Sequence, residues 1–238
     1  MKKVAVVIPA YNEEKSIASV VSEINKLKVE GFDFTPIIVN DASKDKTAKI
    51  ASKLDCVFID LTVNLGIGGT VQTGFIYAFH NGFDYAMQVD GDGQHPPTEI
   101  PKLVTVIKDN NYDVVIGSRF IDKTGFQSSY MRRFGINYLK FIIRFYTGLK
   151  ITDSTSGFRL LNLSALKVVN GYYPDEYPEP ESIILFHKKR LKIKEVAVLM
   201  DERQGGESSI RAFNTLYYMV KVSLAIFYTF IRIKQKSK

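Results

Sequence analysis

The alternation of short apolar runs with stretches of helical periodicity constrains the fold of this chain most strongly. Five runs have the length and residue types of buried strands, and they cover residues 3–8, 34–39, 56–61, 85–89 and 114–117. Between them, apolar residues recur at helical spacing, as at Ile17, Val20, Val21 and Ile24. Strands that alternate with helices form a largely parallel sheet. We therefore predict an α/β domain with a mainly parallel sheet flanked by helices.

The second half of the chain is less regular. Helices are predicted at 132–146, 182–189 and 212–234, a strand at 196–200, and a polar loop at 153–159. We find neither an internal repeat nor a low-complexity linker, so this half is expected to complete the same domain.

Polar residues follow four of the apolar runs, at the point where each strand is expected to end. They are Tyr11, Asp41, Asn64 and Asp90. Ligands of parallel sheets bind outside the carboxyl ends of the strands. The four residues are therefore expected to lie along one edge of the sheet and to form one site.

Asp90 and Asp92 stand one residue apart directly after the fourth run. Gly91 between them allows the backbone to turn, so that both carboxylates can converge. Two such carboxylates, with water and phosphate oxygens as further ligands, suit Mg²⁺ or Mn²⁺. A plain turn is the alternative reading of Asp-Gly pairs, and the shared sheet edge favours the metal. A calcium loop is excluded, because Pro101 stands where that loop needs a Glu.

Residue types exclude several other sites and partners. Cys56 is the single cysteine, which excludes an internal disulfide, and the three His residues lack the spacing of a zinc site. The net charge of +7 indicates an anionic partner. No nucleic-acid-binding fold is recognisable, so nucleic acid is not an expected partner. No signal peptide is visible, which is compatible with a cytoplasmic protein.

The C-terminal segment, 212–238, combines an apolar helix with a basic tail. Its longest uncharged run, 222–231, is about half of the roughly 20 residues that a membrane span needs. An amphipathic helix lying on an anionic membrane surface is one expectation, and a core or homodimer helix is the other. This divides the chain into a domain at 1–211 and a helix at 212–238.

Five motifs in order resemble family 2 glycosyltransferases with the Rossmann-like GT-A fold, in the branch of dolichyl-phosphate mannose synthase. They are Pro9-Ala10-Tyr11-Asn12-Glu13, Asn40-Asp41-Ala42-Ser43-Lys44-Asp45, Asn64-Leu65-Gly66, Asp90-Gly91-Asp92-Gly93-Gln94-His95-Pro96 and Ser156-Gly157-Phe158-Arg159. The resemblance covers nearly the whole chain.

The resemblance implies a role for each motif in binding a nucleotide sugar. Pro9, Tyr11 and Glu13 would line the base and ribose, and Asp41 would contact the base. We expect Asn64 and Gly66 to line the same nucleotide pocket.

The resemblance also implies how the diphosphate is held. Asp90 and Asp92 would bind the metal on it, with Gln94 as a further ligand, and Arg203 would close on the phosphates. Asn40 replaces the usual first Asp of its motif, which leaves the base preference open.

The acceptor decides whether a catalytic base is needed. A hydroxyl needs one, and Glu179 and Glu181 are the candidates, with Glu181 preferred and Asp153 a third. A phosphate is already ionised and needs none. Arg159 and Arg132 are candidates for binding an acceptor phosphate, and a solvated helix face is the alternative for Arg132.

These features together predict a metal-dependent, inverting glycosyltransferase of cell-envelope or polysaccharide synthesis. It would take a UDP-, GDP- or dTDP-sugar to a polyprenyl phosphate or a lipid-linked saccharide, as a peripheral protein at the cytoplasmic face of the membrane. A nucleotidyltransferase is an alternative, but residues 9–13 lack its Gly-rich basic loop. The other alternative is a non-catalytic basic module that binds membrane or nucleic acid.

Overall fold

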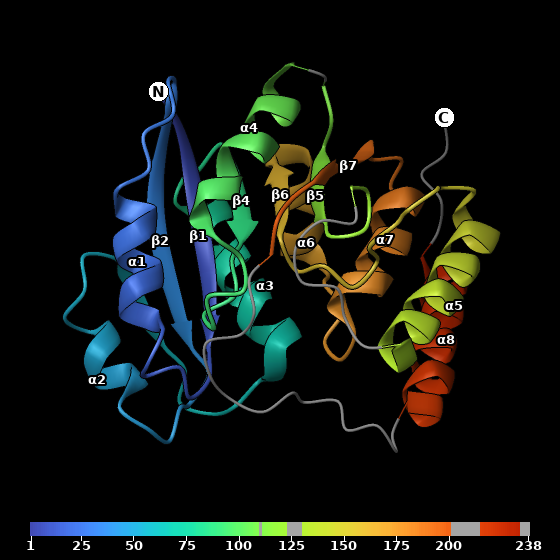
Figure 1. Ribbon diagram of the computed structural model, residues 1–238, viewed down its shortest axis with the longest axis horizontal. Coiled ribbons are helices and arrows are strands. Elements are labelled where there is room, and N and C mark those ends of the chain that lie inside the picture. The colour runs from blue at the N-terminus through green and yellow to red at the C-terminus, as the bar shows by residue number, and fades with distance from the viewer. Residues whose placement is uncertain (110, 123–129, 201–214, 234–238) are drawn as a thin grey trace.

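The computed structural model describes residues 1–109, 111–122, 130–200 and 215–233 as one seven-stranded sheet with helices on both faces (Figure 1). The strands are β1 (Lys2–Ala10), β2 (Phe32–Asn40), β3 (Val57–Asp60), β4 (Tyr85–Gln88), β5 (Val114–Ser118), β6 (Arg159–Asn162) and β7 (Ile193–Ala197). The helices are α1 (Ile17–Asn25), α2 (Thr47–Ala51), α3 (Gly66–His80), α4 (Ile100–Asp109), α5 (Tyr130–Thr147), α6 (Leu163–Gly171), α7 (Pro178–Lys188) and α8 (Thr215–Arg232), with a short 3₁₀ turn at Pro97–Glu99.

The sheet has the order β3-β2-β1-β4-β6-β5-β7, and β6 alone of these strands runs antiparallel to its neighbours. The predicted mainly parallel sheet is therefore confirmed. β6 itself was not predicted, because it has only two apolar residues, Leu160 and Leu161, between Arg159 and Asn162 and follows a polar stretch. Since β6 runs the other way, the residues that precede it reach the edge where the parallel strands end.

The core lies in two layers, one on each face of the sheet. β1 is buried from Val4 to Ala10, and its side chains alternate: Val4, Val6 and Ile8 face one layer, Ala5 and Val7 the other. The first layer is closed by α1, α2 and α4, and the second by α3, α6 and α7. α5 and α8 pack side by side against α7 (Figure 1).

Helix α8 shares the core of the domain. Val222 and Ile226 are fully buried in the second layer, and the hydroxyl groups of Ser223 and Tyr138 are hydrogen-bonded at 2.8 Å. The predicted boundary after residue 211 falls outside the described residues.

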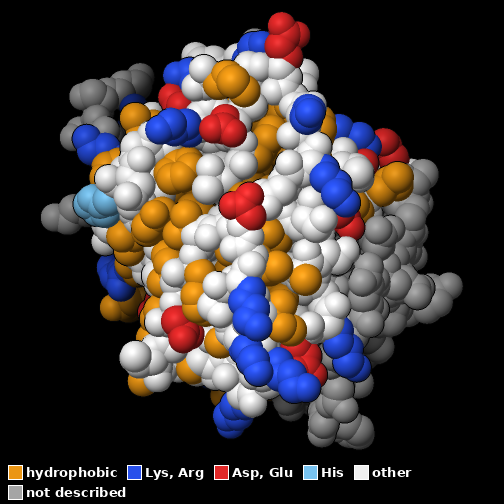
Figure 2. Space-filling view, turned by 90° about the vertical axis from the view of Figure 1, so that its left-hand side faces the viewer, with side chains coloured by type: hydrophobic (Ala, Val, Ile, Leu, Met, Phe, Trp, Pro, Cys, Tyr) orange, Lys and Arg blue, Asp and Glu red, His pale blue; other side chains and the backbone are white. Residues whose placement is uncertain are grey.

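The outward face of α8 is apolar rather than charged, because residues 222–231 include no charged side chain. Exposed apolar side chains on α8 are Val220, Leu224, Phe227, Tyr228 and Ile231. Lys221 and Arg232 are the charged residues of the described helix, and whether its exposed side meets a membrane or a second subunit stays a prediction. None of the helices in the described part of the chain is long and apolar enough to span a membrane. The face around α1 and α2 differs, since Lys, Arg, Asp and Glu side chains are spread across it (Figure 2).

Candidate active site

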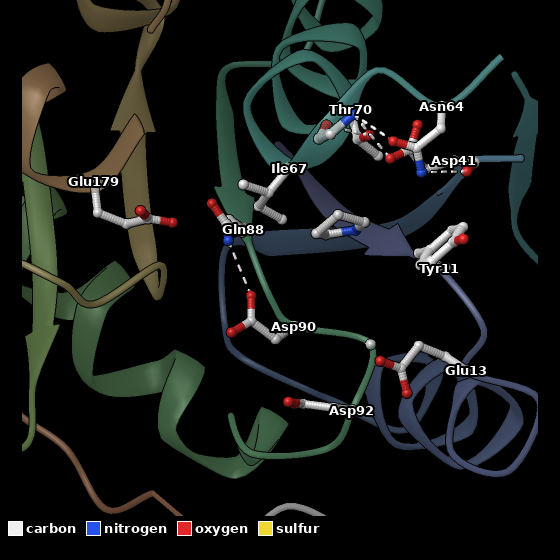
Figure 3. Close-up of a pocket in the computed structure, with 14 residues that line it drawn as sticks. Tyr11, Glu13, Asp41, Asn64, Ile67, Thr70, Gln88, Asp90, Asp92 and Glu179 are labelled. Carbon is white, nitrogen blue, oxygen red and sulfur yellow. Dashed lines mark hydrogen bonds between the residues drawn. The ribbon is translucent and has the colours of Figure 1, made fainter. Parts of the chain in front are cut away.

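A cavity of about 500 Å³ lies at the carboxyl ends of β1, β2 and β4 (Figure 3). Its lining consists of Pro9, Ala10, Tyr11, Glu13, Asp41, Asn64, Gly66, Ile67, Thr70, Gln88, Asp90, Gly91, Asp92 and Glu179. The lining includes Pro9, Tyr11, Glu13, Asp41, Asn64, Gly66 and Asp90, which were assigned from the sequence to the base, the ribose, the pocket around them and the metal on the diphosphate. The four polar residues expected at one sheet edge thus lie around one cavity.

Asp41 fixes one wall of the cavity by binding the start of α3. Its Oδ1 accepts a hydrogen bond from the Leu65 amide at 2.6 Å, and its Oδ2 accepts one from the Gly66 amide at 3.0 Å. Asn64 donates through Nδ2 to the Asp41 carbonyl at 3.1 Å. Gly66 has a φ of 74°, a left-handed conformation that glycine adopts without steric cost. The Asn64-Leu65-Gly66 motif therefore positions the pocket wall through backbone hydrogen bonds.

The loops after β1 and β2 hold each other in the same way. The Lys44 amide donates to Asn12 Oδ1 at 2.8 Å, and the Asn12 amide donates to Ser43 Oγ at 3.0 Å. Asn12 does not cap a helix, because α1 begins only at Ile17 after Ser16. Asn12 instead joins two loops that border the nucleotide pocket.

Asp90 and Asp92 turn to the same side of the cavity, as the intervening Gly91 allows (Figure 3). Gln88 Nε2 donates to Asp90 Oδ1 at 2.9 Å, and the Gln94 amide donates to Asp92 Oδ1 at 2.9 Å. One oxygen of each carboxylate is therefore held by a protein donor. Gln94 contributes this amide, and its side chain is not in the described lining of the cavity.

The carboxylate pair fits a hard divalent cation. Among the described residues, no cluster of three His, Cys, Asp or Glu could hold a metal. The protein would thus supply Asp90 and Asp92, and a bound ligand and water the remaining oxygens, an arrangement typical of Mg²⁺ and Mn²⁺. His95 is buried behind the pair and accepts from the Asp90 amide through Nδ1 at 3.2 Å. Its ring lies 5.0 Å from that of Phe158.

The segment before β6 packs directly on this carboxylate loop. A Cβ at Gly157 would lie 2.4 Å from Gln88 Nε2 and 3.4 Å from Asp90 Oδ1. A larger residue would displace the side chain that orients Asp90. This close approach explains the glycine of the Ser156-Gly157-Phe158-Arg159 motif.

Asp153 lies beneath the site, where no acceptor can reach it. It is fully buried and paired with Arg119, with Nε–Oδ2 and Nη2–Oδ1 distances of 2.7 and 2.8 Å. Burial raises the pKa of Asp153, but the hydrogen bonds and charge of Arg119 outweigh burial and hold that pKa below its ordinary value. Its assignment as an acceptor ligand or a base is therefore wrong, and its role is to position Arg119.

Arg119 is not part of the described cavity lining, but its charge acts on Asp90 and Glu179, which are, and it was not singled out from the sequence. It directly follows β5, and its side chain is mostly buried beside Thr155, to which Nη2 donates at 3.0 Å. Burial lowers the pKa of its guanidinium, but Asp153 together with the charges of Asp90 and Glu179 raises it above its ordinary value. The signal was available, because Arg119 follows a strand end as Asp41 and Asp90 do.

Arg159 is only 2% exposed, and its guanidinium is used entirely within the protein. It donates to the carbonyls of Ser154, Ser156 and Glu179 and to the Ser182 hydroxyl, at 2.7 to 3.1 Å. Its assignment to an acceptor phosphate is therefore wrong, since these contacts hide it. Arg159 fixes the first turn of α7 and with it the position of Glu179.

Glu179 and Glu181 point in different directions, although both belong to the first turn of α7. Glu179 faces the cavity, across from Asp41 and Asn64 (Figure 3). Glu181 is buried against α8, where its Oε2 accepts from the Thr229 hydroxyl at 3.0 Å. Burial raises the pKa of both carboxyls. The sequence-based preference for Glu181 is wrong, because this contact turns it away from the cavity.

Two predicted residues cannot be placed. Arg203 lies outside the described residues, and Arg132 lies in the first turn of α5, where the structure does not describe its side chain. Their assignments to the diphosphate and the acceptor stay predictions.

Comparisons with known proteins match this chain to glycosyltransferases. The model of glycosyl transferase family 2 matches residues 5–169. The UDP-N-acetylglucosamine–dolichyl-phosphate N-acetylglucosaminyltransferase of Methanococcus voltae is 33% identical, over 98% of this chain and 96% of that protein. The undecaprenyl-phosphate mannosyltransferase of Micrococcus luteus is 27% identical, over 87% of each chain.

A solved structure shares the fold. Glucosyl-3-phosphoglycerate synthase from Mycobacterium tuberculosis, crystallised with Mn²⁺, UDP and phosphoglyceric acid, superimposes with a TM-score of 0.72. The alignment covers 98% of this chain and 79% of that one at 18% sequence identity. The expected GT-A fold is thereby confirmed.

Proposed function

Because the chain belongs to glycosyl transferase family 2, we propose that it moves a sugar from a nucleotide-sugar donor to a membrane-borne polyprenyl phosphate. Two of the similar proteins are named for dolichyl-phosphate and undecaprenyl-phosphate acceptors, and their similarity extends over most of their length. Family membership also disfavours the alternatives of a nucleotidyltransferase and a non-catalytic basic module.

One observation carries the proposal: a single cavity joins a wall fixed by Asp41, the Asp90 and Asp92 pair, and Glu179. Its volume of about 500 Å³ is within the usual range for pockets that hold small ligands and cofactors. The nucleoside would lie against Pro9, Tyr11 and Asp41, and the diphosphate would then lie at the carboxylate pair.

The main requirement of the reaction is to stabilise the negative charge that develops on the departing diphosphate. A divalent cation on Asp90 and Asp92 would neutralise that charge as a Lewis acid. The protein orients the two carboxylates through Gln88 and the Gln94 amide. Of the mostly buried cations described around the site, we assign Arg119 to the phosphate of the acceptor, because Asp153 holds its guanidinium close to Asp90 and Glu179.

A phosphate acceptor needs no base, because its oxygen is already ionised. In the inverting displacement that the family resemblance implies, that oxygen attacks the anomeric carbon as the bond to the diphosphate breaks. A lipid-linked saccharide is the second candidate acceptor, and the position of Glu179 favours it. Its carboxylate could take the proton of a hydroxyl, and burial raises its pKa toward the range of a general base.

The membrane surface would meet the apolar face, which consists of Phe141 and Phe145 on α5 with Leu224, Phe227 and Ile231 on α8. Phe141 and Phe145 are 66% and 73% exposed. We propose that this face rests on the cytoplasmic side of the membrane, near the lipid acceptor. Changing Phe145 and Leu224 to Ser should release the protein from vesicles. A homodimer through the same face would instead appear as a mass change in light scattering.

The donor is identified by thermal-shift measurements with UDP-, GDP- and dTDP-sugars, with and without Mn²⁺ or Mg²⁺. Transfer to a short polyprenyl phosphate is then followed by mass spectrometry. Asp92→Asn should lower transfer at least about 100-fold, whereas Asp55→Asn, an exposed carboxylate elsewhere, should leave it unchanged. Full turnover by Asp92→Asn would refute the metal role, and a product without a lipid would refute the acceptor.

A further inference from the structure

A second cavity, of about 830 Å³, lies at the opposite edge of the sheet from the active site. Asp113 and Leu191 belong to its lining; Asp113 directly precedes β5, and Leu191 stands two residues before β7, so the cavity is at the amino ends of these strands. Its walls come from α6, α7 and the end of α8. The proposed transfer reaction does not use it.

Three cations from three different helices line this cavity. They are Lys167 on α6, Lys189 at the end of α7, and Arg232 at the end of α8. Within the described part of the chain, none of the three forms an ion pair with a carboxylate. The Arg232 guanidinium is stacked over the Tyr172 ring, 4.1 Å from its centroid. One of the three charges is therefore held in place by packing, without being neutralised.

Asp113 is the single acidic side chain described in the lining, and its oxygens are engaged. Oδ1 accepts from Asn162 Nδ2 at 2.9 Å, and Oδ2 accepts from the Lys192 amide at 2.7 Å. These contacts join the start of β5 to the end of β6 and to the residue before β7, and they engage both oxygens of Asp113. The lining keeps an excess of positive charge.

Apolar side chains complete the lining, among them Val168, Leu185 and Leu191. The cavity thus offers cations at its rim and apolar surface inside. Arginine and lysine together suit a phosphate group, which the guanidinium can bind with two parallel hydrogen bonds. The volume exceeds what one inorganic phosphate fills, and the apolar lining suits a ligand that also has a carbon body.

We propose that this cavity binds a phosphate ester, with the phosphate held by Lys167, Lys189 and Arg232 and the organic part against the apolar lining. The ester could be an anionic phospholipid headgroup or a soluble phosphorylated metabolite. Tyr228 and Ile231 of the last turn of α8 are exposed next to Arg232, which would let a lipid reach the site from the membrane. Only the lipid source rests on the membrane surface proposed above.

The test uses the full chain and a double variant, Lys167→Glu with Lys189→Glu. A matched control, Lys28→Glu with Lys53→Glu, changes two exposed lysines near α1 and α2 and gives the same net charge. Binding of sn-glycerol 3-phosphate is measured by calorimetry, and partition is measured on vesicles of phosphatidylglycerol and of phosphatidylcholine. Arg232→Gln, a milder change, is measured alongside.

A lipid headgroup predicts that partition to phosphatidylglycerol vesicles falls at least about tenfold in the double variant and far less in the control. A soluble ester predicts that glycerol 3-phosphate binds to the wild type and to the control with similar affinity. It should bind to the double variant at least about tenfold more weakly. Equal losses in double variant and control, or no binding of either probe by the wild type, would overturn the proposal. Asp92→Asn should bind these probes like the wild type, which separates this site from a failure of the proposed transfer reaction.

Discussion

The two walls of the active-site cavity are built on different physical principles. The donor wall, around Asp41, consists of loops after parallel strands that bind one another's backbone amides. The proposed acceptor wall presents Glu179 to the cavity. It is supported by the mostly buried ion pair of Arg119 with Asp153, which is not itself in the described lining, and by the contact of Arg159 with the Glu179 carbonyl. Hydrogen bonds to backbone amides fix the loops that would bind the nucleotide. The buried ion pair instead fixes a positive charge that acts on Asp90 and Glu179, on the side where we propose that the acceptor enters.

The largest expected effect is the loss of stability when one partner of the buried Arg119–Asp153 ion pair is removed. Asp153→Ala leaves the Arg119 charge buried without its carboxylate, and we expect a loss of about 3–5 kcal/mol in the free energy of unfolding. Urea denaturation measures it. The matched control is Asp84→Ala, since Asp84 pairs with Lys2 at the same distance of 2.7 Å but on the exposed surface. Its loss should be much smaller, and equal losses would show that burial is not the cause.

Arg119→Lys separates an effect on the transfer reaction from an effect on nucleotide binding. The lysine keeps the charge beside Asp153 but lacks the fork that binds two oxygens. Transfer should fall by about 100-fold, while the dissociation constant for the nucleotide changes less than about threefold. Single-turnover transfer and calorimetry measure the two quantities. A parallel loss of nucleotide affinity would assign Arg119 to the donor instead.

A change in the donor wall should weaken nucleotide binding and leave the transfer step nearly unchanged, and this effect should be smaller than that of Arg119→Lys. Asp41→Asn has one acceptor oxygen instead of two, so either the Leu65 amide loses its Asp41 acceptor or the Gly66 amide keeps only Asn64 Oδ1, at 3.2 Å. We expect about tenfold weaker nucleotide binding, with kcat at saturating donor nearly unchanged. The control is Asp33→Asn, which changes an exposed carboxylate on β2. A fall in kcat with normal affinity would mean that Asp41 acts in the reaction itself.

The same contrast explains which parts of the site could be predicted. The donor wall follows from local patterns: an apolar run predicts a strand, and the polar residue after it lies at the ligand edge. Asp41, Asn64 and Asp90 were found in this way. Arg119 obeys the same rule and was missed only because its strand end was not treated as a site.

The acceptor wall depends on contacts between distant segments. Asp153 and Arg159 stand in one polar stretch, and nothing in that stretch indicates that both are buried. Their partners Arg119 and Glu179 are 34 and 20 positions away. Residues two positions apart on a helix face different directions, so the choice between Glu179 and Glu181 required the orientation of α7. That orientation is set by Thr229 on α8 and by Arg159, both remote in sequence.

Replacement of Glu179 tests the chemical class of the acceptor, and with a phosphate acceptor it should have the smallest effect on kcat. With a phosphate acceptor, Glu179→Gln should change kcat less than about threefold, because no proton must be removed. With a hydroxyl acceptor, the same change should lower kcat by about 10²–10⁴-fold.

The pH dependence then has opposite signs for the two acceptors. Burial raises the pKa of Glu179, so its carboxyl stays neutral to higher pH than an exposed glutamate and becomes charged as pH rises through that pKa. A charged Glu179 would repel an acceptor phosphate, so KM for the acceptor should rise with pH in the wild type relative to Glu179→Gln. As a base, the charged form would be the active one, and kcat of the wild type should rise instead. Ionisation of the acceptor itself affects both proteins equally, so the ratio of wild type to variant isolates Glu179. If the ratios of kcat and of KM between wild type and variant do not change with pH, Glu179 contacts neither acceptor. Arg119 would then be the remaining candidate for binding the acceptor.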